Sequence, residues 1–506
     1  MGAHRCEEGT GREETRGGSL ARTVLGGTGL IAAAGGITKL LSLITAPILT
    51  RTLGPSPYGV VALLGTVTSL ATTVALLGVD LSYSRFFFSG DREDSANVER
   101  FCWRFAIGSA CIVSLTAGLA WWGGSDRLEL SGGLALMIVI GVFLAVVNVM
   151  ATTRQRLRGA YARIAASIVG AGAVTAVLSV LLALFWKRDA WALLLGAAGG
   201  VVVGTAIAGL PSLGNLRERS GYPWSYRWEI LRLGLAGAVT APMFWLMNSA
   251  DRWFIGMWLG PGPLGVYSFA SGMGTIGILV NSAITLAWYP EMSRAYEASE
   301  QEARVQIGRL WARLAAILLI VWLAVAAAGG DAIRLLTDAR FHQGVPYVPW
   351  IAGGIFFYGI FGIANTGLVL KKNLTPAVGW WVLGAAVNAG LNFLLVRRVG
   401  ALGAAIAFSL GFALIAWGVM CSAQARFHLP VPWVSLGIAS GLTFVAGIAM
   451  AAPWSDSAVK SLLLKFPLGV VCSLAVMRIV APDWVRRFLS GEFTRWVSKD
   501  GPADHN

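Results

Sequence analysis

The sequence predicts an all-α polytopic membrane protein of about fourteen transmembrane helices, arranged as two six-helix halves plus two C-terminal helices. Three observations support this: 56% of the 506 residues are hydrophobic and only 13% are charged, the apolar residues form fourteen helix-length runs, and one short motif recurs. A soluble domain carries about 25% charged residues, and a helix needs about 20 apolar residues to cross a bilayer. The composition therefore excludes a soluble enzyme and a secreted disulfide module.

The apolar runs divide the chain into two lobes bounded by polar segments. Among the single runs, the second helix is expected at about 59–82 and the seventh at about 232–258. In chain order, the expected segments are a cytoplasmic N-terminal tail at 1–23, an N-lobe with helices 1–6 at 24–213, a cytoplasmic linker at 214–231, a C-lobe with helices 7–12 at 232–422, helices 13 and 14 at 434–480, and a cytoplasmic amphipathic tail at 481–506.

The positions of lysine and arginine predict the orientation of the chain. Loops on the same side as the N-terminus hold 28 of the 40 basic residues, and the opposite loops hold 10. Only Lys39 and Arg252 are assigned to spans. Because short cytoplasmic loops are enriched in basic residues, both termini are expected in the cytoplasm. The net charge of +14 then reflects contact with anionic lipid headgroups, and no nucleic-acid partner is expected.

The recurring motif is a Gly/Pro turn that follows the first and the seventh predicted helices. Leu53–Val60 reads LGPSPYGV and Leu259–Val266 reads LGPGPLGV, so six of eight positions match at an offset of 206 residues. Prolines fix φ, and glycines permit positive φ and close helix approach, which indicates a rigid outer turn. The turn or hinge candidates are Gly54, Pro55, Gly59, Gly260, Pro261 and Gly265. The offset favours a duplication of a six-helix half, an architecture common among alternating-access transporters.

Cysteine and histidine give no sign of metal or redox chemistry. The five cysteines include no CxxC pair, and the four histidines at 4, 342, 428 and 505 form no HExxH motif. No loop is long enough to hold a soluble catalytic domain. We therefore expect no catalytic residue, no metal and no cofactor other than a coupling H+ or Na+.

Several segments, in this order, resemble one family of membrane proteins. They are Thr50–Pro55 with Tyr58–Gly59, Leu231–Gly234, Ala250–Gly256, Gly265–Ser268, Asn388–Asn392 and Val399–Ala405. The chain resembles the bacterial polysaccharide and O-antigen lipid flippases of the multidrug/oligosaccharidyl-lipid/polysaccharide exporter superfamily. The resemblance spans about residues 24–480. It departs at Gly234–Gly237, where family members often carry a proline, and it lacks the dense cavity arginines of the peptidoglycan-precursor branch.

The resemblance implies a flippase in the cytoplasmic, or inner, membrane. Its expected substrate is an undecaprenyl-diphosphate-linked oligosaccharide, moved to the outer leaflet for lipopolysaccharide O-antigen or exopolysaccharide biosynthesis. Alternating access coupled to an ion gradient is the expected mechanism. Membrane lipids and the polysaccharide polymerase or export machinery are the expected partners. The glycan, the coupling ion and the oligomeric state are left open by the sequence.

Charged residues within spans are the first candidates for function, because each costs about 2.5–3.5 kcal/mol on insertion scales. Lys39, near the middle of helix 1, is expected to attract the substrate diphosphate, with snorkelling or a structural ion pair as the alternative. Asp251 and Arg252 are adjacent in helix 7 and so point about 100° apart. Asp251 is the candidate for proton or cation coupling and Arg252 for the cavity, with a structural role for the pair about as well supported.

Other polar residues give weaker candidates. Asp80 and Arg85, near the inner end of helix 2, are gate candidates, although a solvated helix end is the favoured interpretation. Asn388 and Asn392 lie four residues apart on one face of helix 11 and are substrate candidates, with interhelical hydrogen bonding as the alternative. The 21 tryptophans lie mostly near span ends, which is typical of an interfacial belt.

Two other functions stay open on the sequence. One is a multidrug or small-molecule antiporter of the same superfamily. The other, less favoured, is a polytopic glycosyltransferase or polymerase acting on lipid-linked sugars, because no outer loop is long and the first outer turn has no carboxylate.

Overall fold

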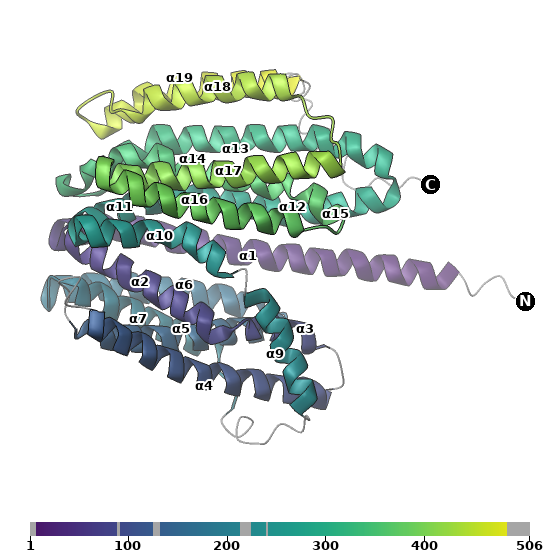
Figure 1. The fold of residues 1–506 in the computed structure, drawn as a ribbon, viewed down its shortest axis with the longest axis horizontal. Coiled ribbons are helices and arrows are strands. Elements are labelled where there is room, and N and C mark those ends of the chain that lie inside the picture. Colours follow the sequence, from purple (N-terminus) through teal and green to yellow (C-terminus); the bar gives the residue numbers. More distant parts are fainter. Residues whose placement is uncertain (1–6, 89–91, 125–131, 213–223, 239–240, 483–506) are drawn as a thin grey trace, which may run out of the picture. The chain divides into compact units, whose positions relative to one another are not determined.

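The computed structural model describes residues 7–88, 92–124, 132–212, 224–238 and 241–482, and these residues are helical with short connections and no strand. The elements are α1 (Glu7–Leu53), α2 (Pro55–Leu76), α3 (Val79–Phe86), α4 (Arg92–Gly124), α5 (Leu134–Leu157), α6 (Tyr161–Phe185), α7 (Ala190–Ala208), α9 (Trp224–Ala238), α10 (Ala241–Leu259), α11 (Pro261–Gly274), η2 (Thr275–Gly277), α12 (Ile278–Ala298), α13 (Glu300–Leu336), η3 (Ala339–Tyr347), α14 (Val348–Ala364), α15 (Thr366–Leu370), α16 (Thr375–Val399), α17 (Ala401–Arg426), α18 (Trp433–Ala451) and α19 (Ala458–Val480) (Figure 1). The all-α polytopic fold is confirmed.

Thirteen helices in the described part of the chain are long and apolar enough to cross a membrane. The predicted seventh span, at about 232–258, is not in this set. It corresponds to α9 and α10, which lie on either side of residues 239–240, outside the described part of the chain. Helix α10 alone is 19 residues long, but Asn248, Asp251 and Arg252 make it less apolar than the thirteen spans.

The predicted second helix is divided into two helices. α2 ends at Leu76 and α3 begins at Val79, with positive φ angles of 44° at Leu77 and 71° at Gly78. A Cβ added at Gly78 would lie 2.2 Å from the carbonyl oxygen of Gly234 on α9. Glycine therefore supplies both the left-handed turn and the close approach of two backbones. The inner end of the predicted helix is a separate short helix.

The segment predicted as a tail at 1–23 is helical from Glu7 onward, as part of α1. The predicted amphipathic tail after residue 482 and most of the expected linker lie outside the described residues.

The chain separates into two compact units. The first comprises Met1–Leu53 and Leu63–Pro242, and the second comprises Gly54–Ala62 and Met243–Asn506. Within the first unit, α6 and α7 pack through small residues spaced four apart. A Cβ at Gly200 would lie 2.0 Å from Thr175 Oγ1, and one at Gly196 would lie 2.0 Å from Ser179 Oγ. Such stripes of small residues let helices approach closely where lipid supplies no hydrophobic driving force.

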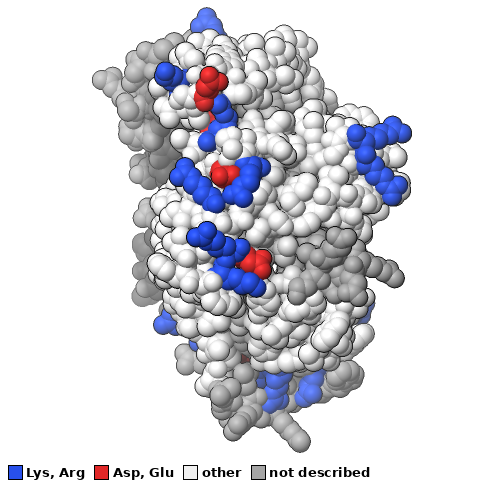
Figure 2. All heavy atoms as spheres, turned by 90° about the vertical axis from the view of Figure 1, so that its left-hand side faces the viewer, with Lys and Arg blue, Asp and Glu red and all other residues white. Residues whose placement is uncertain are grey.

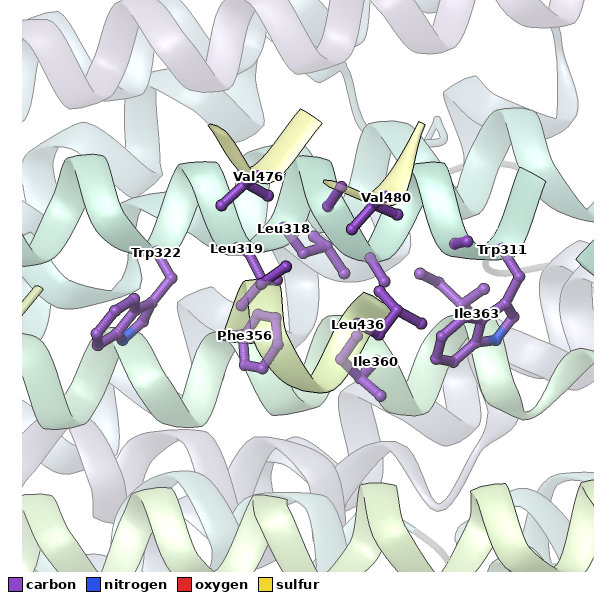
Figure 3. Packing of buried hydrophobic residues seen from close by; sticks show 14 of the residues in the cluster. Trp311, Leu318, Leu319, Trp322, Phe356, Ile360, Ile363, Leu436, Val476 and Val480 are labelled. Carbon is purple, nitrogen blue, oxygen red and sulfur yellow. The ribbon is translucent and has the colours of Figure 1, made fainter. Parts of the chain in front are cut away.

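The second unit has a continuous apolar core built on the long helix α13. Figure 3 shows Trp322 and Trp311 of α13 at the two ends of a row of buried side chains, with Phe356 of α14, Leu436 of α18 and Val476 of α19 between them. The hairpin α18–α19, which corresponds to the predicted helices 13 and 14, thus packs on α13. The added helices are integral to the second unit.

The Gly/Pro sequence repeat is also a structural repeat. Gly54 and Gly260 have φ angles of 74° and 82°, and the proline after each begins a helix. A Cβ at Gly59 would lie 1.9 Å from the carbonyl oxygen of Pro261, and one at Gly265 would lie 1.8 Å from that of Pro55. This reciprocal contact between equivalent residues is what a local two-fold axis between the turns produces. Tyr58 also packs edge-on against Phe341 of η3, with ring centroids 5.5 Å apart.

Candidate functional site

Asp251 is a buried carboxylate within the α10 half of the seventh span. Its side chain accepts a hydrogen bond from the hydroxyl of Tyr267 on α11, and both residues are buried. The guanidinium of Arg252 is directed elsewhere, since its Nη1 donates to the backbone oxygen of Asn248 at 2.8 Å. A carboxylate within a span needs such partners to offset its lost hydration. Asp251 thus bonds to a residue of a neighbouring helix, whereas Arg252 Nη1 bonds within its own helix.

Asn388 and Asn392 are buried on α16 and bonded to each other. Asn392 Nδ2 donates to the backbone oxygen of Asn388 at 3.0 Å and to its Oδ1 at 3.2 Å. Two polar atoms of this pair, Asn388 Nδ2 and Asn392 Oδ1, are buried with no hydrogen-bond partner among the described residues. Buried amide atoms are usually satisfied, so this pair has a free donor and a free acceptor for a water, an ion or a substrate group.

The asparagine pair and Asp251 lie at similar heights in the second unit. A Cβ at Gly411 of α17 would lie 3.0 Å from both Asn388 Cβ and Met247 Cε, which places Met247 of α10 near Asn388. Further along both helices, the rings of Trp258 and Phe393 are 5.5 Å apart, so α10 and α16 run in the same direction. Asp251 lies four residues beyond Met247, and Asn392 lies four residues beyond Asn388, which is a rise of about 6 Å along each helix.

Lys39 differs from these residues in being exposed. Its helix α1 lies against α6 in the first unit, where Thr38 faces Gly172. The Lys39 side chain lies on the exposed side of α1, and no carboxylate among the described residues pairs with it. An unpaired ammonium near mid-span is costly in lipid, so this position favours contact with water or an anionic group.

Asp80 and Arg85 belong to α3 and not to the long helix in which they were predicted. Asp80 lies in the first turn of α3, where the helix dipole favours an acidic side chain, and Arg85 is exposed in the last turn. No ion pair joins them in the described part of the chain. The short helix instead docks on α9 through Ser82 Oγ, which donates to the backbone oxygen of Ile230 at 2.6 Å.

Two ion pairs with a buried carboxylate were not predicted from the sequence. Asp331 of α13 and Lys465 of α19 are almost fully buried, with Oδ2 and Nζ 2.6 Å apart. Ser461 Oγ donates to the same carboxylate oxygen at 2.9 Å. Lys465 is counted with the outer loops, although it lies in the segment 434–480 predicted for helices 13 and 14. The structure places it within α19. The interpretation that only Lys39 and Arg252 lie within spans is therefore wrong. In the first unit, buried Glu99 binds Arg154 at 2.7 Å.

A charged cluster joins several elements at the end of the second unit predicted to face the cytoplasm. Glu300 Oε1 accepts from Lys371 Nζ at 2.8 Å and from Arg304 Nη2 at 2.7 Å. The hydrogen bond to Glu300 raises the pKa of the Lys371 ammonium group. Lys371 Nζ also lies 5.4 Å from the ring centroid of Tyr296. This cluster ties α12, α13 and the connection after α15.

Figure 2 views the end that includes the α18–α19 loop, where lysines and arginines gather in small groups with acidic residues beside several of them. In a connection of the second unit that is predicted to lie outside, Arg340 Nε donates to Asp338 Oδ1 at 2.7 Å. The hydrogen bonds from Arg340 lower the pKa of Asp338.

Two recesses in the second unit are too apolar for a charged or sugar-bearing ligand. One of about 300 Å³ lies among α13, α14, α17 and α18, lined by residues such as Trp311, Phe357 and Trp433. The other, of about 470 Å³, lies between α13 and α19 and is lined mainly by leucine and alanine; Lys465 borders it, but its ammonium is bound to Asp331. Polar recognition is therefore expected at the Asp251 and Asn388 region and not in these recesses.

Comparisons with known proteins agree on one fold. The sequence pattern of a family described as "Polysaccharide biosynthesis protein" matches residues 24–296, and the MatE pattern matches residues 238–394. No curated protein matches the sequence. The structure of the lipid II flippase MurJ in an inward closed conformation has a TM-score of 0.70 and 12% identity, covering 90% of this chain and 99% of that one.

Drug transporters share the fold over less of the chain. An inward-facing multidrug resistance MATE family transporter of the MOP superfamily has a TM-score of 0.56 and 16% identity, covering 77% of this chain and 94% of its own. An outward-facing one has a TM-score of 0.52 and 15% identity, with 80% and 95% covered. At these identities the likeness concerns the fold alone.

Proposed function

Because this chain belongs to the polysaccharide biosynthesis protein family, we propose that it is a flippase for undecaprenyl-diphosphate-linked oligosaccharides in the cytoplasmic membrane. The family match over residues 24–296 is the observation that carries the proposal. The flippase structure also covers more of the chain than either drug-transporter structure does. Transport of this kind makes and breaks no covalent bond, so it needs binding groups and two alternating conformations only.

Each part of the proposed substrate has a suitable partner in the chain. The exposed Lys39 ammonium offers a charge-assisted hydrogen bond to the diphosphate. The free amide atoms of Asn388 and Asn392 offer a donor and an acceptor to sugar hydroxyls. The prenyl chain needs no polar partner and can stay in the bilayer. In this scheme Arg252 is a second cationic group, available once its bond to Asn248 is released.

Asp251 is the proposed coupling residue for an H+ or Na+ gradient. A buried carboxylate hydrogen-bonded to Tyr267 can bind a proton or a cation, and the loss of charge on protonation favours a different set of partners. A coupling free energy of 1–3 kcal/mol corresponds to roughly 5- to 150-fold. Asp251→Asn is therefore expected to lower gradient-driven flipping by about tenfold or more and to spare exchange without a gradient. Asp338→Asn is the matched control, because this half-buried carboxylate lies in a connection outside the spans and pairs with Arg340.

The experiment is reconstitution of the full chain in proteoliposomes with a lipid-linked glycan in both leaflets. An enzyme added outside modifies only accessible glycan, so protein-dependent flipping raises the modified fraction above one half. Faster flipping than in protein-free vesicles, accelerated further by a gradient, is the expected result. No acceleration for any lipid-linked glycan would contradict the proposal.

A second candidate function is drug antiport, favoured by the MatE match over residues 238–394. The same vesicles discriminate the two: gradient-driven uptake of an organic cation such as ethidium, with no glycan flipping, would favour the antiporter. Modification of the glycan by the chain itself would favour the polymerase or glycosyltransferase alternative.

A further inference from the structure

Four aromatic rings of the second unit form a closed cycle of contacts. Tyr358 and Phe361 of α14 are stacked with centroids 6.1 Å apart, and Phe361 meets Trp381 of α16 edge-on at 5.4 Å. Trp381 meets Phe412 of α17 at 6.0 Å, and Phe412 meets Tyr358 at 5.5 Å. We call these four residues the aromatic quartet.

The quartet leaves ring surface uncovered on one side. Phe412 is 1% exposed and forms its base, whereas Tyr358, Phe361 and Trp381 are each half-buried. A quartet that served only to fill the core would be expected to bury all four rings, as Trp103 and Phe427 are buried elsewhere. Three rings held by a buried fourth make a rigid apolar surface at little cost in conformational entropy.

Polar residues border this surface, which distinguishes it from the faces that meet lipid. On the neighbouring helix α12, Thr285 is exposed and Tyr289 is half-buried, and the Tyr289 hydroxyl lies 3.4 Å from the backbone oxygen of Gly362. By contrast, α18 and α19 expose aliphatic residues such as Val434, Ile448 and Leu463. A rigid aromatic surface with a polar border is typical of a site for small polar ligands with an apolar face.

The quartet is continuous with the asparagine pair. Trp381, Asn388 and Asn392 lie at i, i+7 and i+11 on α16 and therefore share one face of the helix. Tyr358 lies ten residues into α14 and Trp381 six residues into α16, which is about 15 Å and 9 Å from their starts. In the orientation predicted from the basic residues, this is the half of the membrane nearer the cytoplasm, where a lipid-linked glycan would enter.

We propose that the aromatic quartet is a carbohydrate platform on which a pyranose ring of the lipid-linked glycan stacks, with Trp381 as its principal contact. The apolar C–H face of a pyranose packs on the half-buried rings, and its hydroxyls reach the polar border at Thr285 and Tyr289. The proposal rests on the proposed flippase function and adds the residues that bind the sugar. The tryptophan at 381 thus has a role other than membrane anchoring.

The test measures binding of two probes to the detergent-solubilised full chain by native mass spectrometry. The probes are undecaprenyl diphosphate carrying one N-acetylglucosamine and undecaprenyl diphosphate alone. Trp381→Ala is expected to weaken binding of the first by about three- to tenfold, the size of one lost aromatic contact, and to leave the second unchanged. Trp381→Phe keeps a ring and is expected to retain most of the preference.

The matched control is Trp380→Ala on the same helix. Trp380 lies outside the quartet, with its Nε1 donating to Ser422 Oγ at 3.0 Å and its ring against Trp417. It is expected to change neither affinity. Thermal unfolding of each variant separates lost binding from lost folding, and Trp381→Phe supplies the folded comparison if Trp381→Ala unfolds.

Each outcome decides a different question. Equal loss of both probes, or no loss of either, would overturn the platform while flipping by the wild-type chain leaves the flippase intact. A third probe, the aromatic cation tetraphenylphosphonium, tests the alternative ligand. If Trp381→Ala weakens binding of this cation and keeps the glycan preference, the platform is overturned in favour of an aromatic drug site. Absence of flipping by the wild-type chain would overturn the proposed function itself.

Discussion

The two units bury polar groups in different places. In the first unit the buried acid, Glu99, is paired with Arg154 near the end of a span, and the span interiors pack through glycine, serine and threonine. In the second unit Asp251, Asn388 and the Asp331–Lys465 pair lie within spans. Burying such groups is expensive, and we propose that Asp251 and Asn388 give the second unit most of the polar recognition. The first unit contributes a closely packed scaffold and an exposed cation near the middle of α1, Lys39.

The largest expected effect comes from breaking the buried pair of the second unit. Asp331→Asn leaves the buried Lys465 ammonium without a carboxylate, and loss of one partner of a buried pair costs about 3–5 kcal/mol. Lys465→Met has a smaller expected effect, because Arg334 Nη1 still binds Asp331 at 3.2 Å. Both variants are expected to unfold at a lower temperature and to loosen α19 from α13. The double variant Asp331→Asn/Lys465→Met is expected to recover most of the loss. Three variants with equal stability would show that the pair is not structural.

A smaller effect is expected from filling the glycine contact of the first unit. Gly200→Ala forces a Cβ to within 2.0 Å of Thr175 Oγ1 and 2.5 Å of the Ala171 carbonyl oxygen. Overpacking of this kind costs about 1–3 kcal/mol. Gly108→Ala on α4 is the matched control, because its Cβ would meet nothing within 4 Å. Equal thermal stability of the two variants would contradict the close packing of α6 and α7.

The flipping rate of Lys39 variants tests the proposed role of this residue. Removing one charge-assisted hydrogen bond to the diphosphate is expected to lower flipping by about tenfold, so Lys39→Gln should be slow and Lys39→Arg nearly normal. The proteoliposome assay measures both. Full activity of Lys39→Gln would favour the snorkelling or structural alternative.

The smallest effect is expected at α3. Arg85 is exposed and unpaired with Asp80, and exposed charges contribute little, so Arg85→Gln should change the flipping rate by less than about twofold. A tenfold loss with unchanged thermal stability would instead support a gate at this position.

The sequence predicted the helical class, the turns and the added hairpin well, because each depends on local signals. The runs at 434–480 match α18 and α19 to within a few residues, and both Gly/Pro turns have the positive φ that their glycines allow. These features needed no knowledge of which helices meet.

Features that depend on helix pairing were harder to predict. The ion pair of Asp331 with Lys465 joins residues 134 apart, and the aromatic quartet joins three helices, so neither has a local pattern. The assignment of Asp80 and Arg85 to one long helix failed because Gly78 turns the chain against Gly234, a contact that only the fold reveals. The roles of Lys39, Asp251 and the asparagines stay predictions.

The central claim is that the second unit binds the glycan of a lipid-linked substrate. It is tested most directly by photocrosslinking, with undecaprenyl diphosphate that carries a diazirine-bearing N-acetylglucosamine, followed by peptide mapping. The account predicts labelled peptides from α12, α14 and α16, competed away by the unlabelled lipid-linked sugar. Labelling confined to the first unit or to the α18–α19 hairpin, or labelling that the competitor does not reduce, would contradict it.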